Sequence, residues 1–352
     1  MIDIGRAVDR WVACGQLGRG VVVSVGAVAA ALVVGGVLMG VEGVAAMSVY
    51  GEVVRGVFVL EHGLSDTAVA ATPLVLVGLG IAIAYRARVF TIGAEGQYLV
   101  GAVAATGWAS ADGVRALPGV LLVGSSVLVA VVAGAGWAAM SAGLLARFGA
   151  SVVITSLLLN YVAAALLAWA VRVGIRQPGS FTPQSKEIGG AALPALPGWG
   201  VHAGFLIAVA AVPVVWVVLA RSRFGYRVDV LRASAEVLRA NEVRPARMVL
   251  AVLVGCGALA GLAGYVEVAG VTGRITPAFA TGYGFTAIVV ALLGRLHPLG
   301  ILVAAGALSA LRIGFEVAQR SYEIPSATVG VILALIVVFF VAGEALVRRG
   351  VG

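Results

Sequence analysis

Residues 67–85 read TAVAATPLVLVGLGIAIAY, and no side chain in this stretch carries a charge. A helix needs about 20 consecutive apolar residues to cross the hydrocarbon core of a membrane, which is about 30 Å thick. Apolar runs of this kind recur along the whole chain. We therefore predict an all-α polytopic membrane protein with about ten transmembrane helices, at 21–41, 67–85, 92–111, 117–145, 152–171, 201–220, 248–270, 276–294, 298–315 and 327–346.

The overall composition favours the same fold class. Hydrophobic residues make up 61% of the 352 residues and charged residues 11%, whereas soluble globular chains carry about 25% charged residues. The net charge of +8 comes from arginines that cluster in short loops between the apolar runs. Orientation in a bilayer explains this charge better than nucleic-acid binding does, so we expect membrane lipid, and no nucleic acid, among the partners.

The distribution of arginine predicts the orientation of the chain, because cytoplasmic loops of membrane proteins carry an excess of Lys and Arg. With the N-terminus in the cytoplasm, the cytoplasmic side holds the seven arginines of the 221–247 loop and also Arg6, Arg10, Arg19, Arg86, Arg88, Arg147, Arg295, Arg348 and Arg349. We predict a multi-pass protein of the plasma (inner) membrane with both termini in the cytoplasm.

The domain organisation follows from the number of helices. We treat 1–352 as a single transmembrane domain, with a first half at 1–171, an outer loop at 172–200 and a second half at 201–352. Five is an odd number of helices for each half, so the second half would run inverted relative to the first, as it does in many transporters.

Glycines mark two features within the spans. The 276–294 span contains Gly282 and Gly284, so we expect a broken or re-entrant helix there. Gly257 and Gly261 are four residues apart, a spacing that lets helix backbones approach closely in lipid. We interpret this second pair as an ordinary helix-packing surface.

The chain lacks the motifs of the common enzyme classes. Its only lysine, Lys186, is not part of a GxxxxGK[ST] loop, which is the phosphate-binding loop of many ATPases. There is no HExxH, GxSxG or paired-carboxylate grouping, the three histidines are isolated, and Cys14 and Cys256 are far apart. We therefore expect no catalytic site, no metal and no cofactor on this chain, and an energy source that is another subunit or an ion gradient.

The 90–97 segment, FTIGAEGQ, is the most informative stretch for function. Glu95 lies between Gly93 and Gly96, and Gln97 follows Gly96, at the start of a spanning run. A carboxylate near membrane depth usually faces a cavity or a polar partner. The alternative is that Glu95 lies at the cytoplasmic interface and pairs with Arg86 or Arg88.

Four blocks of sequence resemble one known family, the permeases of bacterial ABC importers for nucleosides and simple sugars (branched-chain amino acid/ribose-type permeases). The stretch FTIGAEGQYLVGA at 90–102 resembles the family's FNIGAEGQ signature. The further blocks follow in the family's order at 149–161, 257–264 and 282–294, and the resemblance covers 67–345. It implies a permease that pairs with a second membrane chain, as a homo- or heterodimer, with cytoplasmic subunits that bind ATP, and with an extracytoplasmic solute-binding protein.

Asn160 is a second polar group at membrane depth, in the middle of the 152–171 span. Such an amide can bind substrate or simply bond a neighbouring helix. The resemblance implies a matching Asn at this position, which favours the substrate path. We therefore expect Glu95, Gln97 and Asn160 to border the translocation path.

The 221–247 loop is the other segment to which we assign a role. It carries seven arginines against three acidic residues, a net charge of +4. Val230, Ala233, Val237 and Ala240 follow one another at spacings of 3, 4 and 3, which gives one apolar stripe on a helix. We predict a short amphipathic helix that lies parallel to the membrane.

Other residues of the loop fit such a helix. Asp229 could cap its start, Arg232 and Glu236 could pair at i, i+4, and Pro245 suits the first turn of the next helix. The helix would couple the chain to the ATPase through four residues: Ala233, Glu236, Val237 and Ala240. The alternative is a solvated loop that binds anionic lipid.

Two functions of different class remain open. The first is the permease subunit of an ABC importer that forms the path for a small polar solute, a nucleoside or a simple sugar. The alternative is an ion-coupled secondary transporter or channel that acts without an ATPase. Such a carrier normally has relays of Asp, Glu or His in the membrane, and beyond Glu95 the predicted spans nearly lack them. An integral membrane enzyme is a third hypothesis, which no catalytic grouping supports.

Overall fold

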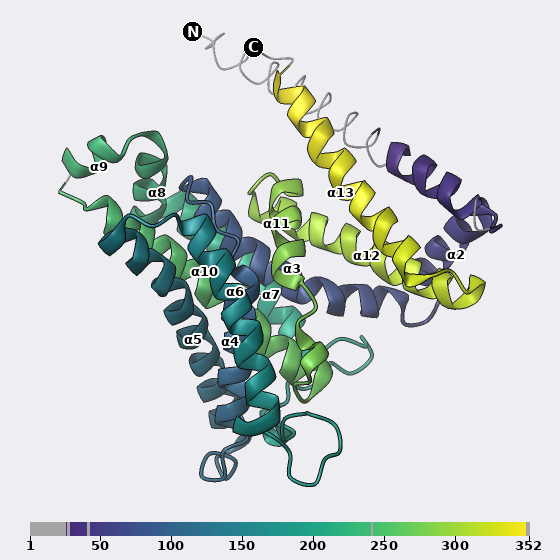
Figure 1. The fold of residues 1–352 in the computed structure, drawn as a ribbon, viewed down its shortest axis with the longest axis horizontal. Coiled ribbons are helices and arrows are strands. Elements are labelled where there is room, and N and C mark those ends of the chain that lie inside the picture. Colours follow the sequence, from purple (N-terminus) through teal and green to yellow (C-terminus); the bar gives the residue numbers. More distant parts are fainter. Residues whose placement is uncertain (1–25, 27–28, 41–42, 241, 350–352) are drawn as a thin grey trace. The chain divides into compact units, whose positions relative to one another are not determined.

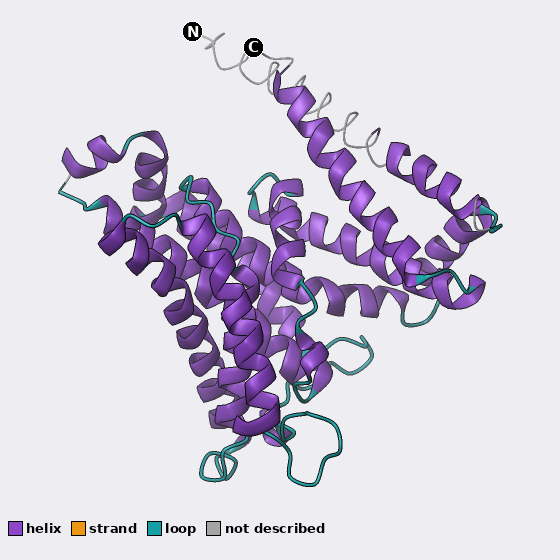
Figure 2. Cartoon of the chain, in the orientation of Figure 1, coloured by secondary structure: helices purple, strands orange, loops and turns teal. Residues whose placement is uncertain are grey.

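The computed structural model describes residues 26, 29–40, 43–240 and 242–349, and this part of the chain is built from helices joined by loops (Figures 1 and 2). No β-strand occurs within these residues, which confirms the all-α fold class. In chain order the helices are Ala29–Gly40, α2 (Ala46–Phe58), α3 (Gly63–Arg86), α4 (Ala94–Ala109), α5 (Gly119–Phe148), α6 (Val152–Trp169), α7 (Ala203–Arg221), α8 (Arg223–Ala233), α9 (Ala235–Ala240), α10 (Pro245–Glu267), α11 (Tyr283–Leu293), α12 (Pro298–Tyr322) and α13 (Ser326–Arg349).

Six helices of the described chain are long and apolar enough to cross a membrane, judged by length and composition. They are α3, α5, α6, α7, α10 and α12, and a five-residue π-helical turn extends both α6 and α10 (Ala170–Gly174 and Val268–Thr272). Shorter apolar helices lie at Ala29–Gly40, Pro277–Leu293 and Ser326–Ile336. The first part of the predicted 21–41 span lies outside the described residues. Four residues named above also lie outside them: Arg6, Arg10, Arg19 and Cys14.

The chain divides into two compact units, one from the described parts of Met1–Leu64 and Ala310–Gly352 and the other from Ser65–Ser309. Helix α2 belongs to the first unit, and the hydropathy pattern did not predict it. The reason is that charged residues interrupt its apolar run: Glu52 and Arg55 lie among Val49, Val53 and Val57, which are buried.

The 276–294 segment is broken, as predicted. Its first part is a single 3₁₀ turn at Pro277–Phe279, and α11 begins only at Tyr283. Gly282 between them has a φ of +80°, in the left-handed region that glycine adopts far more readily than other residues. The break gives the Ser65–Ser309 unit a short helix whose N-terminus packs against the start of α4.

Helices α4, α5 and α10 of this unit meet backbone to backbone at glycines. A Cβ on Gly134 of α5 would collide with the carbonyl oxygen of Gly257 of α10, and one on Gly261 would collide with that of Ala130. A Cβ on Gly101 of α4 would overlap the backbone of Gly261. Small residues allow this close approach of helices in lipid, so the interpretation of Gly257 and Gly261 as a packing surface is confirmed.

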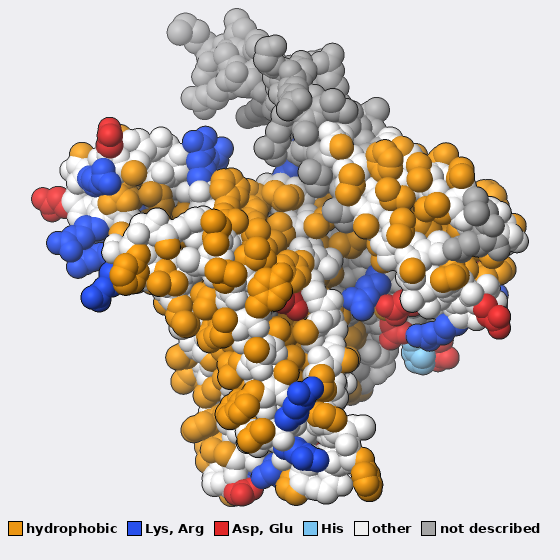
Figure 3. Space-filling view, in the orientation of Figure 1, with side chains coloured by type: hydrophobic (Ala, Val, Ile, Leu, Met, Phe, Trp, Pro, Cys, Tyr) orange, Lys and Arg blue, Asp and Glu red, His pale blue; other side chains and the backbone are white. Residues whose placement is uncertain are grey.

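The 172–200 loop packs against one end of the same unit. The Ser185 N–H donates to the carbonyl oxygen of Ile275 at 2.9 Å, and Lys186 pairs with Asp112 of the α4–α5 loop at 3.5 Å. Figure 3 shows a broad band of apolar side chains over α4, α5 and α6, with the charged side chains of this unit gathered at its two ends. This distribution is the one expected of helices that cross a bilayer.

The glycine contact predicts opposite effects for two substitutions on α10. An alanine within a helix is normally more stable than glycine by about 0.5–1 kcal/mol. At Gly261 the added methyl group meets backbone, and overpacking of about 1–3 kcal/mol should lower the Tm of the solubilised chain by about 3–10 °C. Gly255, where a Cβ meets nothing within 4 Å, is the control, and Gly255→Ala should leave the Tm unchanged or raise it. Equal Tm values for the two variants in a thermal-unfolding assay would contradict this packing.

Candidate translocation and coupling sites

The 90–97 segment enters the bundle as a turn that α6 holds in place. The Thr91 hydroxyl accepts a hydrogen bond from the Gly93 N–H at 3.2 Å, and the Ile92 N–H donates to Ser156 Oγ at 3.1 Å. Gly93 is the N-cap of α4, and a Cβ there would lie 2.8 Å from the Cβ of Ser156. A larger residue at Gly93 would therefore push α6 away from the turn.

Asn160 of α6 holds the first turn of α4. Its Oδ1 accepts from the Gly96 N–H at 2.9 Å, and its Nδ2 donates to the carbonyl oxygen of Ile92 at 2.9 Å. The first N–H groups of a helix have no partner inside the helix. Because Asn160 is buried, its amide supplies the partner that water would supply at an exposed helix end.

Glu95 performs the same task for α11. Its Oε1 accepts from the Gly282 N–H at 3.1 Å and its Oε2 from the Gly284 N–H at 2.7 Å. A carboxylate is favourable at a helix N-terminus, where the helix dipole and the unpaired N–H groups are positive. The alternative prediction, that Glu95 pairs with Arg86 or Arg88, is wrong. The buried carboxylate bonds to the α11 backbone instead.

Gln97, the third predicted path residue, is buried beside this cluster, and its Oε1 has no hydrogen-bond partner within the described residues. The same holds for Trp137 Nε1 of α5, which would lie 3.1 Å from a Cβ on Gly96. Leaving a buried polar group unpaired costs about 1–3 kcal/mol. A solute or water that enters here gains hydrogen bonds that the described protein groups do not supply.

Tyr98, which was not among the predicted path residues, extends the cluster toward α11. Its ring stacks on that of Phe279, with centroids 5.3 Å apart and planes at 6°, and the ring of Tyr283 lies 5.9 Å away. Tyr98 is fully buried, and its hydroxyl has no hydrogen-bond partner in the described part of the chain. Its place directly after Gln97 was the signal that the sequence offered.

The 221–247 loop forms two helices where we predicted one. Ser222 caps α8, with its Oγ accepting from the Phe224 N–H at 3.1 Å. Ser234 caps α9 in the same way, with its Oγ accepting from the Glu236 N–H at 3.2 Å. Serine at an N-cap satisfies the first unpaired N–H groups of a helix, so Ser234 ends one helix and starts the next.

Two details of the predicted helix are wrong and one is confirmed. Asp229 does not cap a helix, because it lies inside α8. Arg232 and Glu236 are not i, i+4 neighbours on one helix, because the chain breaks between them at Ser234. Pro245 does occupy the first turn of α10.

Asp229 instead pairs with Arg86, the last residue of α3. The Nε and Nη2 of Arg86 donate to the two carboxylate oxygens, each at 2.9 Å. The hydrogen bonds from Arg86 hold the pKa of Asp229 below its ordinary value. A bidentate pair of this kind also fixes the geometry of its two partners, so it ties α8 to the end of α3.

The predicted coupling residues lie on the outside of α8 and α9. Leu238 is buried and anchors α9 to the core of the unit. Val237, its neighbour, is 52% exposed, and Ala233, Glu236 and Ala240 are exposed as well. A partner protein can therefore reach all four residues.

Comparisons with known proteins give the family. Residues 63–341 match the family described as branched-chain amino acid transport system, permease component. The chain is 37% identical to a glucose ABC transporter permease protein of Haloferax volcanii, over 100% of this chain and 93% of that protein. It is 28% identical to a guanosine ABC transporter permease protein of Bacillus subtilis, over 83% and 84% of the two chains.

A nucleoside ABC transporter permease protein of Lactococcus lactis is a third relative, 27% identical over 80% of this chain and 79% of that protein. No solved structure matches the chain. The family match includes the 90–97 turn, the α4 and α11 N-termini and the 221–247 loop. The chain therefore belongs to the family of permease components of the branched-chain amino acid transport type, and it is a membrane-embedded ABC transporter permease.

Proposed function

We propose that this chain forms the translocation path of an ATP-driven importer for a nucleoside or a simple sugar. The relatives named for glucose, guanosine and nucleoside transport support this solute class. The observation that carries the proposal is the buried cluster of Glu95, Gln97 and Asn160, where the N-termini of α4 and α11 meet in an apolar bundle. Polar groups at membrane depth are costly and usually serve a substrate or ion pathway.

The two helix N-termini mark where the solute passes. In many transporters the N-termini of short, interrupted helices point at the substrate site. Here Glu95 occupies the N-terminus of α11 and Asn160 that of α4. When α11 separates from α4, backbone N–H groups and the Glu95 carboxylate become available together. Sugar or ribose hydroxyls can accept hydrogen bonds from these N–H groups and donate hydrogen bonds to the Glu95 carboxylate. A neutral solute also brings no charge that must be compensated.

Replacing Gln97 with methionine separates a path role from a structural one. Methionine has nearly the same shape and removes the unpaired oxygen, so the fold should be as stable as before or more stable. We expect solute uptake in proteoliposomes to fall about tenfold or more, the effect of one lost hydrogen bond to a bound solute. Asn160→Leu is the comparison, because it should lower both uptake and Tm. Normal uptake by Gln97→Met would remove Gln97 from the path.

For the 221–247 loop we propose that the exposed residues Ala233, Glu236, Val237 and Ala240 dock in a groove of the ATP-binding subunit. A short helix with an apolar anchor can lie in such a groove. The Arg86–Asp229 pair would pass the movement of α8 to the end of α3 and so to the 90–97 turn. ATP then acts on the partner subunit, and the permease itself holds no cofactor.

Val237→Asp tests this docking. A charge in the apolar centre of the contact should abolish co-purification of the ATPase or uncouple ATP hydrolysis from uptake, while the permease still inserts. Val237→Thr, which keeps the shape of the side chain, is the control and should couple normally. Unchanged co-purification and unchanged solute-stimulated hydrolysis in Val237→Asp would show that α9 is not the coupling element. Uptake that needs no ATPase at all would instead favour an ion-coupled carrier.

We also propose the full topology: about ten spans in two inverted halves, both termini in the cytoplasm, a second permease chain beside this one, and a solute-binding protein on the outer face. The contacts within the Ser65–Ser309 unit support the assignment of sides. The 172–200 loop meets Ile275 and Asp112, all predicted outside, and Arg86 meets Asp229, both predicted inside. Every one of these contacts joins segments assigned to the same side.

Single cysteines in a chain without Cys14 and Cys256 test the orientation. Thr182 and Ala240 are both exposed, so each cysteine can react without unfolding. An impermeant thiol reagent added to intact cells should label Thr182→Cys and should label Ala240→Cys only after the cells are opened. The reverse pattern would invert the topology and rule out docking of a cytoplasmic ATPase on α9.

A further inference from the structure

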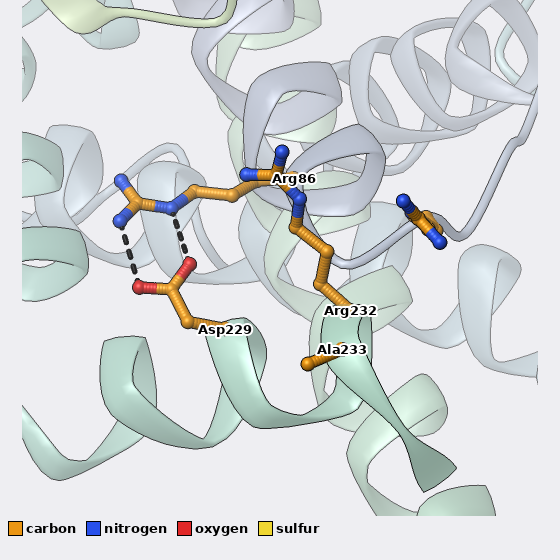
Figure 4. A pocket seen from close by; sticks show the side chains of 5 residues that line it. Arg86, Asp229, Arg232 and Ala233 are labelled. Carbon is orange, nitrogen blue, oxygen red and sulfur yellow. Dashed lines mark hydrogen bonds and ion pairs between the residues drawn. The ribbon is translucent and has the colours of Figure 1, made fainter.

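A pocket at the end of α3 brings together three arginines from two distant parts of the chain (Figure 4). Its volume is about 420 Å³, and it is lined by Arg86, Arg88, Asp229, Arg232 and Ala233. Figure 4 shows Arg86 extended toward Asp229, and the Arg232 side chain rising from α8 toward α3. The lining carries three positive charges and one negative charge.

Only one of these three positive charges is matched by an ion pair. The Arg86 guanidinium donates hydrogen bonds to both carboxylate oxygens of Asp229. The guanidinium groups of Arg88 and Arg232 make no hydrogen bond or ion pair with any residue in the described ranges. Asp229 also attracts Arg232 electrostatically, but its two oxygens are bonded to Arg86, so the pocket keeps an excess of positive charge. Such a pocket is a site for an anion, since guanidinium groups bind phosphate through paired N–H groups.

Arg88 stands in a backbone conformation that favours glycine. Its φ is 58°, and the N–H of Val89 donates to the carbonyl oxygen of Ala84 at 3.0 Å. This is the hydrogen-bond pattern of a helix C-terminus at which glycine usually occupies the left-handed position. A cation there is favoured by the helix dipole.

The surroundings of the pocket match the depth of lipid headgroups. Arg86 is the last residue of α3, a candidate spanning helix. Phe90, two residues beyond Arg88, is 55% exposed, and Tyr226, one turn before Asp229 on α8, is 68% exposed. Exposed aromatic rings gather at the membrane–water interface, and basic pockets at the ends of spanning helices bind anionic headgroups.

We propose that this pocket binds the phosphate group of an anionic phospholipid between Arg88 and Arg232. The bound phosphate would bridge the end of α3 and the end of α8, next to the ion pair of Arg86 with Asp229, and so fix α8 against the membrane. The site depends on neither the solute nor the side of the membrane. A free phosphate ion offers the same chemistry, and a carboxylate of a partner protein is the other occupant to be tested.

The test compares phospholipid binding by two double variants of the full-length chain. Native mass spectrometry of the solubilised protein measures the affinity for phosphatidylglycerol and, as the neutral reference, phosphatidylcholine. Arg88→Gln with Arg232→Gln should weaken phosphatidylglycerol binding about 25-fold, from roughly fivefold for each arginine at a membrane surface. Arg239→Gln with Arg244→Gln removes the same charge from exposed positions of the same loop outside the pocket, and should weaken it less than about twofold.

Further variants and ligands make each outcome decisive. Arg88→Lys with Arg232→Lys keeps both charges and should retain most of the binding, which excludes misfolding as the cause of a loss. An equal loss in both glutamine variants, or no loss in either, would overturn the pocket. Displacement of phosphatidylglycerol by millimolar inorganic phosphate would overturn the lipid as occupant, and its retention supports the lipid. Loss of a co-purifying ATPase with unchanged lipid binding would overturn the proposal in favour of a protein partner.

Discussion

The first N–H groups of a helix cannot be buried away from water without a partner, and the placement of α4 and α11 depends on this constraint. Ser156 and Asn160 of α6 supply the partners for the turn that opens α4, and Glu95 of α4 supplies them for the start of α11. Each cap comes from a neighbouring helix. The same few polar groups therefore position three helices, and breaking them frees two helix ends at once.

Both backbone packing and polar capping hold α4 in place. One face of the helix lies directly on α10 at Gly101 and Gly264, where no side chain separates the backbones, and this contact is rigid because nothing in it can rotate. Helix α11 also meets α4 backbone to backbone, because a Cβ on Gly284 would overlap the backbone of Glu95. The Glu95 carboxylate and the rings of Tyr98 and Tyr283 add side-chain contacts. Backbone packing and side-chain hydrogen bonds therefore both hold the first turn of α11 on α4.

A continuous series of contacts connects the exposed face of α9 with the polar cluster. Leu238 anchors α9 in the core of the unit, and Asp229 of α8 holds Arg86 at the end of α3. The chain then runs through the 90–97 turn into Glu95, whose carboxylate reaches α11. A partner that displaces α9 would then act on the segment that carries Glu95, the cap of α11. A headgroup between Arg88 and Arg232 would stiffen the first part of this connection.

The sequence by itself determined the membrane class, the break at 276–294, the glycine contact of α10 and the residues of the polar cluster. These are local properties: apolar runs, glycine positions and isolated polar groups are visible within a few residues. It did not determine the partners of those groups. The Glu95 carboxylate bonds to backbone N–H groups up to 189 residues away, and a backbone amide has no sequence signature. Similarly, the sequence predicted a helix cap for Asp229. The tertiary structure instead brings Arg86 within 2.9 Å of it, and Ser222 and Ser234 cap the two helices.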